Sequence, residues 1–187
     1  RSLSPAGEGY RTISTLGAAM GRQYVHAKVA DTLIAAFASR WKDEEGRIIL
    51  VGETGYRTGG PISRHTTHQN GLSVDIMMPV RENGKVSEMP TYPWQQYGYG
   101  NEFDEKGQMG DYSIDFESLA SLLLEIEKQG ASRSVRIERI SIASEYIPRL
   151  LGTKAGKNFG RLQKTIMRKT AWTRHDDHVH LDFAVSS

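Results

Sequence analysis

The sequence predicts an α+β fold, in which helices pack on one side of a small antiparallel sheet. Two observations carry this prediction. Apolar residues recur at helical spacing in two stretches, residues 18–41 and 113–129. Short segments that are β-branched, or that alternate between apolar and polar residues, lie between and after these stretches, at residues 47–53, 72–77, 135–143 and 178–185.

The two long helices are expected to be amphipathic. In residues 18–41, apolar side chains such as Val29 and Leu33 alternate with charged ones, and His26 is expected to have a packing or surface role, with lining of a site as the alternative. In residues 113–129, acidic residues lie near the N-terminus, where negative charge is favourable. A third, short helix is expected over residues 144–152.

The strand candidates differ in their side-chain patterns. Residues 47–53 (RIILVGE) indicate a buried strand, whereas LSVDIM at 72–77 alternates and points Asp75 away from its apolar face. In HVHLDF, the same alternation puts His178, His180 and Asp182 on one face of the strand.

The remaining segments carry weaker signals. Residues 1–17 are expected to be an irregular lead-in, and residues 79–112 a long loop that is either functional or partly disordered. The aromatic residues of that loop could line a groove or pin it to the body; they are Tyr92, Trp94, Tyr97 and Tyr99. Residues 146–175 hold eight Lys or Arg and no acidic residue, which indicates a solvated surface or, alternatively, contact with an anionic polymer.

Size and composition exclude several classes of protein. The 187 residues predict a single domain over 1–187. A net charge of +2 gives no reason to expect a nucleic-acid partner, and no apolar run approaches the ~20 residues that membrane insertion requires. The absence of cysteine excludes disulfides, thiolate nucleophiles and cysteine-rich zinc sites, and it makes the chain compatible with an oxidising compartment.

Five of the six histidines crowd into two short segments, RHTTHQNGLSVDI at 64–76 and HDDHVH at 175–180. If the strands that carry Asp75 and His180 are sheet neighbours, these residues can approach one ion, and His68 can complete the set from the preceding loop. Two histidines and one carboxylate suit Zn²⁺, and three protein ligands leave a position for water, whose pKa then falls from ~15.7 towards ~7.

The other clustered histidines are candidates for supporting roles. His178 lies two residues from a ligand on the same strand face, and it is the best candidate for proton transfer or for stabilising an oxyanion. His65 and His175 each precede another of these histidines by three residues, and they could orient ligands or hold substrate.

The stretch GYRTGGPISRHTTHQNGLSVDI, together with HDDHVHLDF, resembles the penicillin-insensitive murein endopeptidases, which belong to the LAS group of zinc metallopeptidases with the lysostaphin-type and D-Ala-D-Ala peptidases. The group signature H-x6-D followed by H-x-H is matched by His68 and Asp75, then by His178 and His180. The resemblance covers most of residues 18–185 and implies a LAS metallopeptidase-like fold, although only the two motifs are specific.

The resemblance implies zinc ligation by His68, Asp75 and His180 and a catalytic role for His178. It also implies active-site roles for His65 and His175. Arg57 in GYRTGG looks like the substrate-binding arginine of the D-Ala-D-Ala peptidases, where a guanidinium suits a peptide carboxylate, and a turn or surface role is its alternative. Gln69 is a candidate pocket residue. The cysteines often found in the periplasmic endopeptidases are absent, which leaves the cleaved bond open.

The function expected from these residues is a zinc-dependent peptidoglycan hydrolase that cleaves the D-alanyl to meso-diaminopimelate cross-link. A D,D-carboxypeptidase or another peptidoglycan amidase on the same fold is an alternative, and so is a zinc-stabilised cell-wall binding module without turnover. An iron oxygenase with two histidines and one carboxylate is disfavoured, because it rests on the type of ligand alone. The expected location is periplasmic or secreted, with the export signal outside the given chain, and the oligomeric state stays open.

Overall fold

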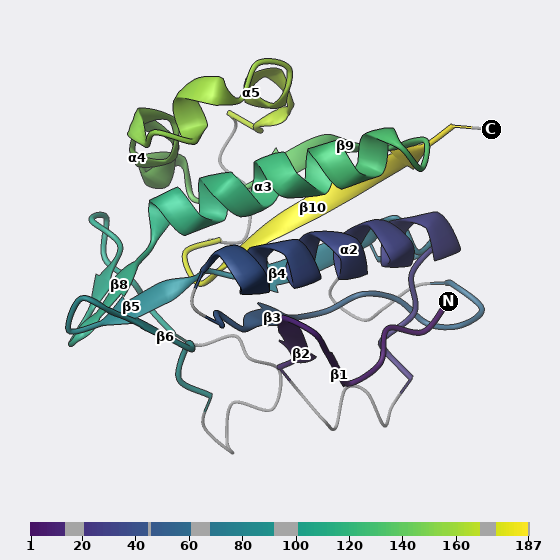
Figure 1. Cartoon of the computed structure of the whole chain (residues 1–187), viewed down its shortest axis with the longest axis horizontal. Helices are drawn as coiled ribbons and strands as arrows, with labels where there is room; N and C mark the ends of the chain where they lie inside the picture. The colour runs from purple at the N-terminus through teal and green to yellow at the C-terminus, as the bar shows by residue number, and fades with distance from the viewer. Residues whose placement is uncertain (14–20, 45, 61–67, 92–100, 169–174, 187) are drawn as a thin grey trace.

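The computed structural model describes residues 1–13, 21–44, 46–60, 68–91, 101–168 and 175–186 (Figure 1). Its main sheet has six strands in the order β1-β2-β3-β4-β10-β9. Their bounds are Ala6–Gly7 (β1), Tyr10–Thr12 (β2), Ile49–Val51 (β3), Ser73–Met77 (β4), Val135–Ser141 (β9) and His178–Val185 (β10). The expected α+β class is confirmed, and every pair in this sheet is antiparallel except β2–β3, which is parallel.

The centre of the sheet brings together segments that lie a hundred residues apart in the sequence. In the antiparallel β4–β10 pair, His180 stands directly opposite Asp75. Strand β10 also pairs with β9, with a register shift between Asp182 and Phe183. The expectation that the two histidine-containing segments are sheet neighbours is therefore confirmed.

Two long helices, α2 (Ala27–Asp43) and α3 (Phe116–Ala131), pack side by side against one face of this sheet (Figure 1). Apolar side chains of both helices meet those of β4, β9 and β10 in one continuous buried core. None of the helices in the described part of the chain is long and apolar enough to span a membrane.

Both helices begin later than the sequence predicts. For α2 the start near residue 18 is wrong over residues 21–26, because Tyr24 forms bridges with Ser2 and Gly55 and His26 caps the helix by accepting a hydrogen bond from the Lys28 amide at 3.3 Å. His26 is exposed, which agrees with the expected surface role. For α3 the start at residue 113 is wrong, because residues 112–114 belong to a strand and Asp115 is the N-cap.

The expected loop at 79–112 contains most of a second, four-stranded sheet, in the order β6-β5-β8-β7. Its strands are Val80–Glu82 (β5), Lys85–Ser87 (β6), Gln108–Met109 (β7) and Tyr112–Ile114 (β8). Positive φ angles of 49° at Asn83 and 79° at Gly84 fit a type I′ turn, for which Asn-Gly is a strong hairpin signal. The loop prediction is thus wrong over these strands, while the four aromatic residues named for it lie outside the described residues.

The lead-in prediction for residues 1–17 is also wrong in part, because β1 and β2 extend the main sheet. The short helix expected over residues 144–152 is confirmed as the 3-10 turn η1 (Ser144–Tyr146) followed by α4 (Ile147–Gly152). It is followed by η2 (Gly156–Asn158) and α5 (Leu162–Thr165) within the basic segment.

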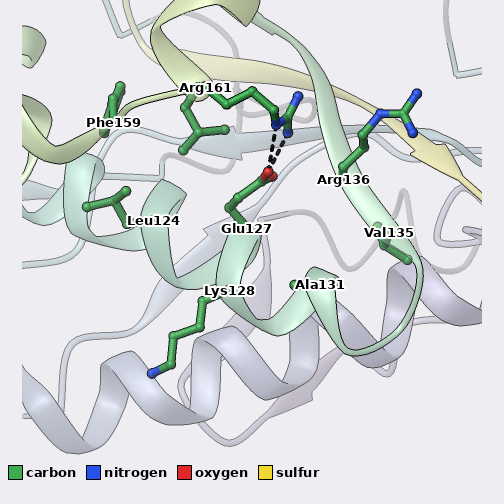
Figure 2. A pocket seen from close by; sticks show the side chains of 9 residues that line it. Leu124, Glu127, Lys128, Ala131, Val135, Arg136, Phe159 and Arg161 are labelled. Atoms are coloured by element: carbon green, nitrogen blue, oxygen red, sulfur yellow. Dashed lines mark hydrogen bonds and ion pairs between the residues drawn. The ribbon is translucent and has the colours of Figure 1, made fainter.

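An open hollow of about 470 Å³ is lined by α3, by the start of β9 and by part of the basic segment, residues 146–175 (Figure 2). Arg161 lies there and donates a hydrogen bond from Nε to Glu127 Oε1 at 3.0 Å. At least one cation of the segment is therefore paired with a carboxylate of α3. Contact with an anionic polymer remains a prediction.

Candidate metal centre

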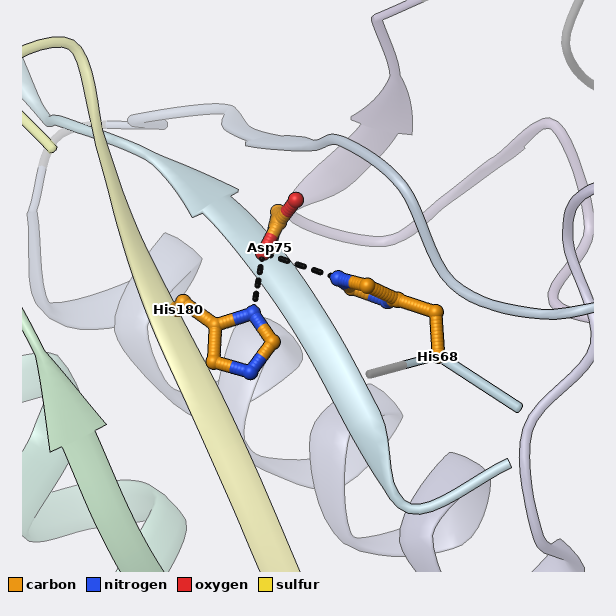
Figure 3. Close-up of side chains that lie close together, drawn as sticks. All are labelled: His68, Asp75 and His180. Atoms are coloured by element: carbon orange, nitrogen blue, oxygen red, sulfur yellow. Dashed lines mark hydrogen bonds and ion pairs between the residues drawn. The ribbon is translucent and has the colours of Figure 1, made fainter. Parts of the chain in front are cut away.

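The candidate centre starts from the cross-strand pair of Asp75 and His180 (Figure 3). The Nδ1 atom of His180 lies 2.7 Å from Asp75 Oδ1. Backbone hydrogen bonds fix Asp75 on its other side, since its amide donates to the Glu53 carbonyl at 2.9 Å and its carbonyl accepts from the Gly52 amide at 2.8 Å. Both side chains therefore project from the interior of a paired sheet, whose backbone holds them in place.

His68 reaches the same carboxylate from the loop before β4, with its Nε2 atom 3.3 Å from Asp75 Oδ1. Its backbone has a positive φ of 63°. Two glycines let the preceding segment pack closely against this loop: a Cβ at Gly55 would lie 2.9 Å from the His68 carbonyl oxygen, and one at Gly59 would lie 2.5 Å from that of Gln69. Glycine is therefore required at positions 55 and 59, because a larger residue would clash with the loop that carries His68.

His68, Asp75 and His180 form a group that could hold a metal ion. Their donor atoms lie within 4.8 Å of one another, and the three residues are 1%, 2% and 6% exposed. Two imidazole nitrogens and one carboxylate oxygen form a donor set that suits Zn²⁺ and several other divalent transition metals. The residues therefore fit a bound metal ion, as the H-x6-D and H-x-H motifs predict.

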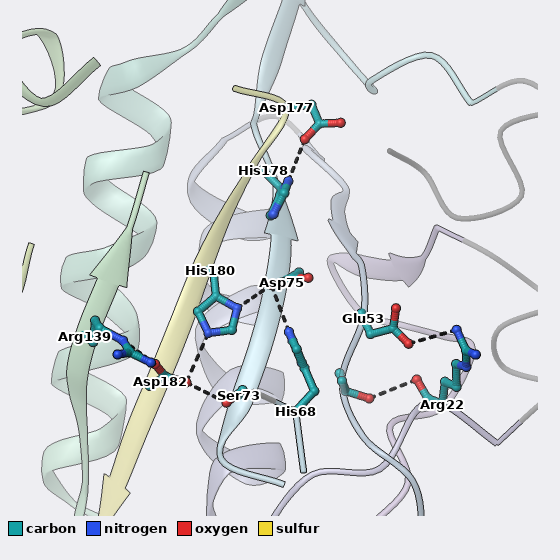
Figure 4. Close-up of polar contacts among 11 residues, drawn as sticks. Arg22, Glu53, His68, Ser73, Asp75, Arg139, Asp177, His178, His180 and Asp182 are labelled. Carbon is teal, nitrogen blue, oxygen red and sulfur yellow. Dashed lines mark hydrogen bonds and ion pairs between the residues drawn. The ribbon is translucent and has the colours of Figure 1, made fainter. Parts of the chain in front are cut away.

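His178 lies beside this group (Figure 4), and the ring of His175 is close to it. The ring centroid of His175 is 4.8 Å from that of His178 and 6.4 Å from that of His180. The Nδ1 atom of His178 is 2.5 Å from Asp177 Oδ1, and both side chains are buried. A carboxylate thus fixes the ring of the histidine expected to exchange protons.

Asp182 lies on the other side of His180, with Oδ1 at 3.1 Å from His180 Nε2 (Figure 4). The Ser73 hydroxyl donates to Asp182 Oδ1 at 2.5 Å, and Arg139 Nε donates to Oδ2 at 2.6 Å. His180 therefore has a carboxylate at each ring nitrogen.

The proton affinities of these groups follow from their pairing. Burial alone would raise the pKa of Asp75, but hydrogen bonds from His180 and His68 outweigh it and hold the pKa well below its usual range. Burial alone would lower the pKa of His180, but the interactions with Asp182 and Asp75 outweigh burial and raise the pKa to about 9. Burial would likewise lower the pKa of His178, but the hydrogen bond to Asp177 outweighs burial and raises the pKa. In the metal-free protein the rings of His178 and His180 are thus favoured as cations, and metal binding by His180 must displace a proton.

The structure brings five of the eight predicted site residues into one cluster: His68, Asp75, His175, His178 and His180. His65 lies outside the described residues. Arg57 is exposed on the turn from Tyr56 to Gly59, so its role stays a prediction.

Gln69 lines an open groove of about 660 Å³ that begins beside the cluster. Ser73, Arg139 and Asp182 form part of the same groove. Gln69, the predicted pocket residue, thus lines a groove, and its contact with substrate stays a prediction.

Two carboxylates that contact the histidines of the cluster, Asp177 and Asp182, were not predicted as site residues from the sequence. The alternation in HVHLDF did place Asp182 on the face of His178 and His180, so a signal for it was present. No such signal existed for Asp177, because it precedes β10 and the alternation of a strand does not apply to it.

A buried group of three metal donors, accompanied by two further histidines, defines a candidate metalloenzyme. Comparison with protein families assigns the chain further: the model of the penicillin-insensitive murein endopeptidases matches residues 1–187, the whole chain. The chain belongs to this family of peptidases, which act on the peptidoglycan of the cell wall. No curated protein matches the chain.

Proposed function

We propose that this protein is a zinc-dependent endopeptidase that opens the D-alanyl to meso-diaminopimelate cross-link of peptidoglycan, in the periplasm or outside the cell. The observation that carries the proposal is the convergence of His68, Asp75 and His180 in a chain of the murein endopeptidase family. The metal ion is proposed to be zinc because two imidazoles and one carboxylate are a donor set that catalytic zinc sites use.

Three residues would hold the zinc ion: His68, Asp75 and His180. When bound, zinc supplies Lewis acidity, which polarises a peptide carbonyl and lowers the pKa of water. The protein provides the burial that strengthens these electrostatic effects, since all three donors are at most 6% exposed.

His178 is proposed to exchange protons with the reacting groups. Because Asp177 engages its Nδ1 atom, we assign proton exchange to Nε2. The carboxylate orients the ring and stabilises its cationic form, so the imidazole can both accept a proton and return it to the leaving amine. His175, whose ring centroid lies 4.8 Å from that of His178 and 6.4 Å from that of His180, is proposed to hold substrate or to orient these rings, and His65 is proposed to assist.

The groove beside Gln69 is the proposed path of the substrate peptide. Its wall carries both charge signs, from Glu138 and Arg139, as recognition of a zwitterionic diaminopimelyl centre would need. Arg57, which is exposed, is proposed to bind a peptide carboxylate.

Purified protein, stripped with a chelator and then reloaded with zinc, tests the proposal on defined muropeptides analysed by mass spectrometry. Cross-linked dimers should become monomers only with the reloaded protein. Dimers that stay intact, where a known endopeptidase cleaves them, would overturn it. Loss of a terminal D-alanine from pentapeptide monomers alone would indicate a D,D-carboxypeptidase, and retention of peptidoglycan without turnover would indicate a binding module.

A further inference from the structure

The His180 ring is held at both of its nitrogens. Its Nδ1 atom faces the candidate metal centre, 2.7 Å from Asp75 Oδ1, and its Nε2 atom faces Asp182 Oδ1 at 3.1 Å. An imidazole that ligates a metal through one nitrogen can still donate the proton of the other. Asp182 is placed to accept that proton.

Asp182 is itself fixed from both neighbouring strands. It stands opposite Ser73 of β4 and opposite Arg139 of β9 in the register of the sheet. The Ser73 hydroxyl donates to Oδ1, and the Arg139 guanidinium donates to Oδ2 through Nε at 2.6 Å, with Nη2 also within 2.5 Å. The fork of Arg139 engages the oxygen that His180 does not use, so the carboxylate has little freedom to rotate.

We propose that Asp182 is a positioning residue for metal binding: by accepting the Nε2–H of His180, it selects the tautomer whose Nδ1 faces the metal and fixes the plane of the ring. Ser73 and Arg139 act through Asp182 and keep its carboxylate in the required orientation. The inference rests on metal binding by His180, which is part of the proposed function, but not on the bond that is cleaved.

The contribution of such an outer carboxylate is large enough to measure. Partners of this kind orient the ligating ring and raise its basicity, and their removal typically weakens metal binding about 10- to 100-fold. Asp182→Ala removes the acceptor altogether. Asp182→Asn keeps a carbonyl oxygen for the Nε2–H but loses the charge, so its zinc affinity should lie between those of wild type and Asp182→Ala.

The test measures the zinc dissociation constant by competition with a chromophoric chelator. Glu88→Gln is the matched control, because Glu88 is likewise paired with an arginine, Arg11 Nε at 2.8 Å, but lies outside the site. Circular dichroism and thermal unfolding of the metal-free variants establish that each is folded. Should Asp182→Ala not fold, Asp182→Asn and Ser73→Ala carry the comparison, and both should bind zinc more weakly than Glu88→Gln.

Cobalt in place of zinc gives a second readout, since its visible spectrum reports the ligand field. The spectrum should change in Asp182→Ala and stay unchanged in Glu88→Gln. Zinc affinity of folded Asp182 variants within twofold of wild type would overturn the inference. Intact zinc binding with no cleavage of muropeptides would overturn the proposed function alone, whereas wild-type protein that binds no zinc would overturn both.

Discussion

His180 links the chemistry of the centre to the stability of the metal-free fold. Its pKa is raised from 6.5 to about 9, since the hydrogen bonds to Asp182 and Asp75 outweigh the effect of burial. A folded-state pKa above the unfolded value means that this stabilisation is complete below about pH 6.5 and is lost as the pH rises through about 9.

We therefore predict that the free energy of unfolding of the metal-free protein falls between pH 6.5 and 9. Denaturant titrations at pH 6, 7.5 and 9 in the presence of a chelator measure it. His180→Ala should show a shallower decline; some decline remains because the pKa of His178 is raised as well. Parallel pH profiles for wild type and variant would contradict this prediction.

His178 is expected to separate catalysis from metal binding. Since it is not one of the three converging donors, His178→Ala should keep its zinc content while turnover of muropeptide dimers falls about 10²- to 10⁴-fold. Metal analysis and initial rates on the same preparation measure both quantities. Loss of zinc together with activity would instead make His178 a ligand, and retained activity would remove it from the mechanism.

At the scale of elements, the Gly-rich run before His68 is expected to position that ligand. Gly59 has a φ of +67°, and a Cβ there would lie 2.5 Å from the Gln69 carbonyl oxygen. We predict that Gly59→Ala lowers the free energy of unfolding by about 1–3 kcal/mol through backbone strain and also weakens zinc binding, because the contacted loop must shift.

Gly84→Ala is the control for this prediction. Gly84 has a similar φ of +79°, but nothing lies within 4 Å of its hypothetical Cβ, and it belongs to the hairpin turn of the second sheet. It should show the strain without the change in zinc affinity. If both variants bind zinc like wild type, the glycine run does not position His68.

The elements that the sequence predicts correctly are those with long or alternating patterns. Strands β4 and β10 alternate over five and eight residues, and the long helices α2 and α3 carry a clear apolar stripe. Strands β1 and β7, of two residues each, are too short to show a period. Their formation depends on neighbouring strands, which a single sequence does not reveal.

The predicted starts of the two long helices were wrong for a related reason, because contacts with distant residues decide where each helix begins. The residues before α3 fit a helical pattern, but pairing of β8 with β5 competes for them, and Asp115 then caps the helix while it also pairs with Arg47. Such tertiary contacts override local preference.

For the whole molecule, the candidate metal centre joins two segments that lie far apart in the sequence and meet in the β4–β10 pair. The motifs were sufficient to predict which residues converge, because metal donors are rare and their spacing is restrictive. They could not predict the residues that support the centre, since Asp177 contacts His178 and Arg139 contacts Asp182 through tertiary geometry that no local pattern encodes.

Removal of the metal is expected to destabilise the whole fold. A ligand that binds only the folded state, at a free concentration of 100 times its dissociation constant, adds about 2.7 kcal/mol to the free energy of unfolding. Denaturant unfolding with zinc and with chelator should differ by about this amount. His68→Ala should lose most of the difference, and a wild-type protein equally stable under both conditions would contradict the prediction.

The distance in sequence between Asp75 and His180 also bears on biosynthesis. A chain interrupted anywhere before residue 178 possesses at most two of the three donors and lacks the strand that carries the third. An unfinished polypeptide is therefore expected to be harmless to the wall, because hydrolytic capacity can arise only after β10 has been synthesised and has inserted between β4 and β9.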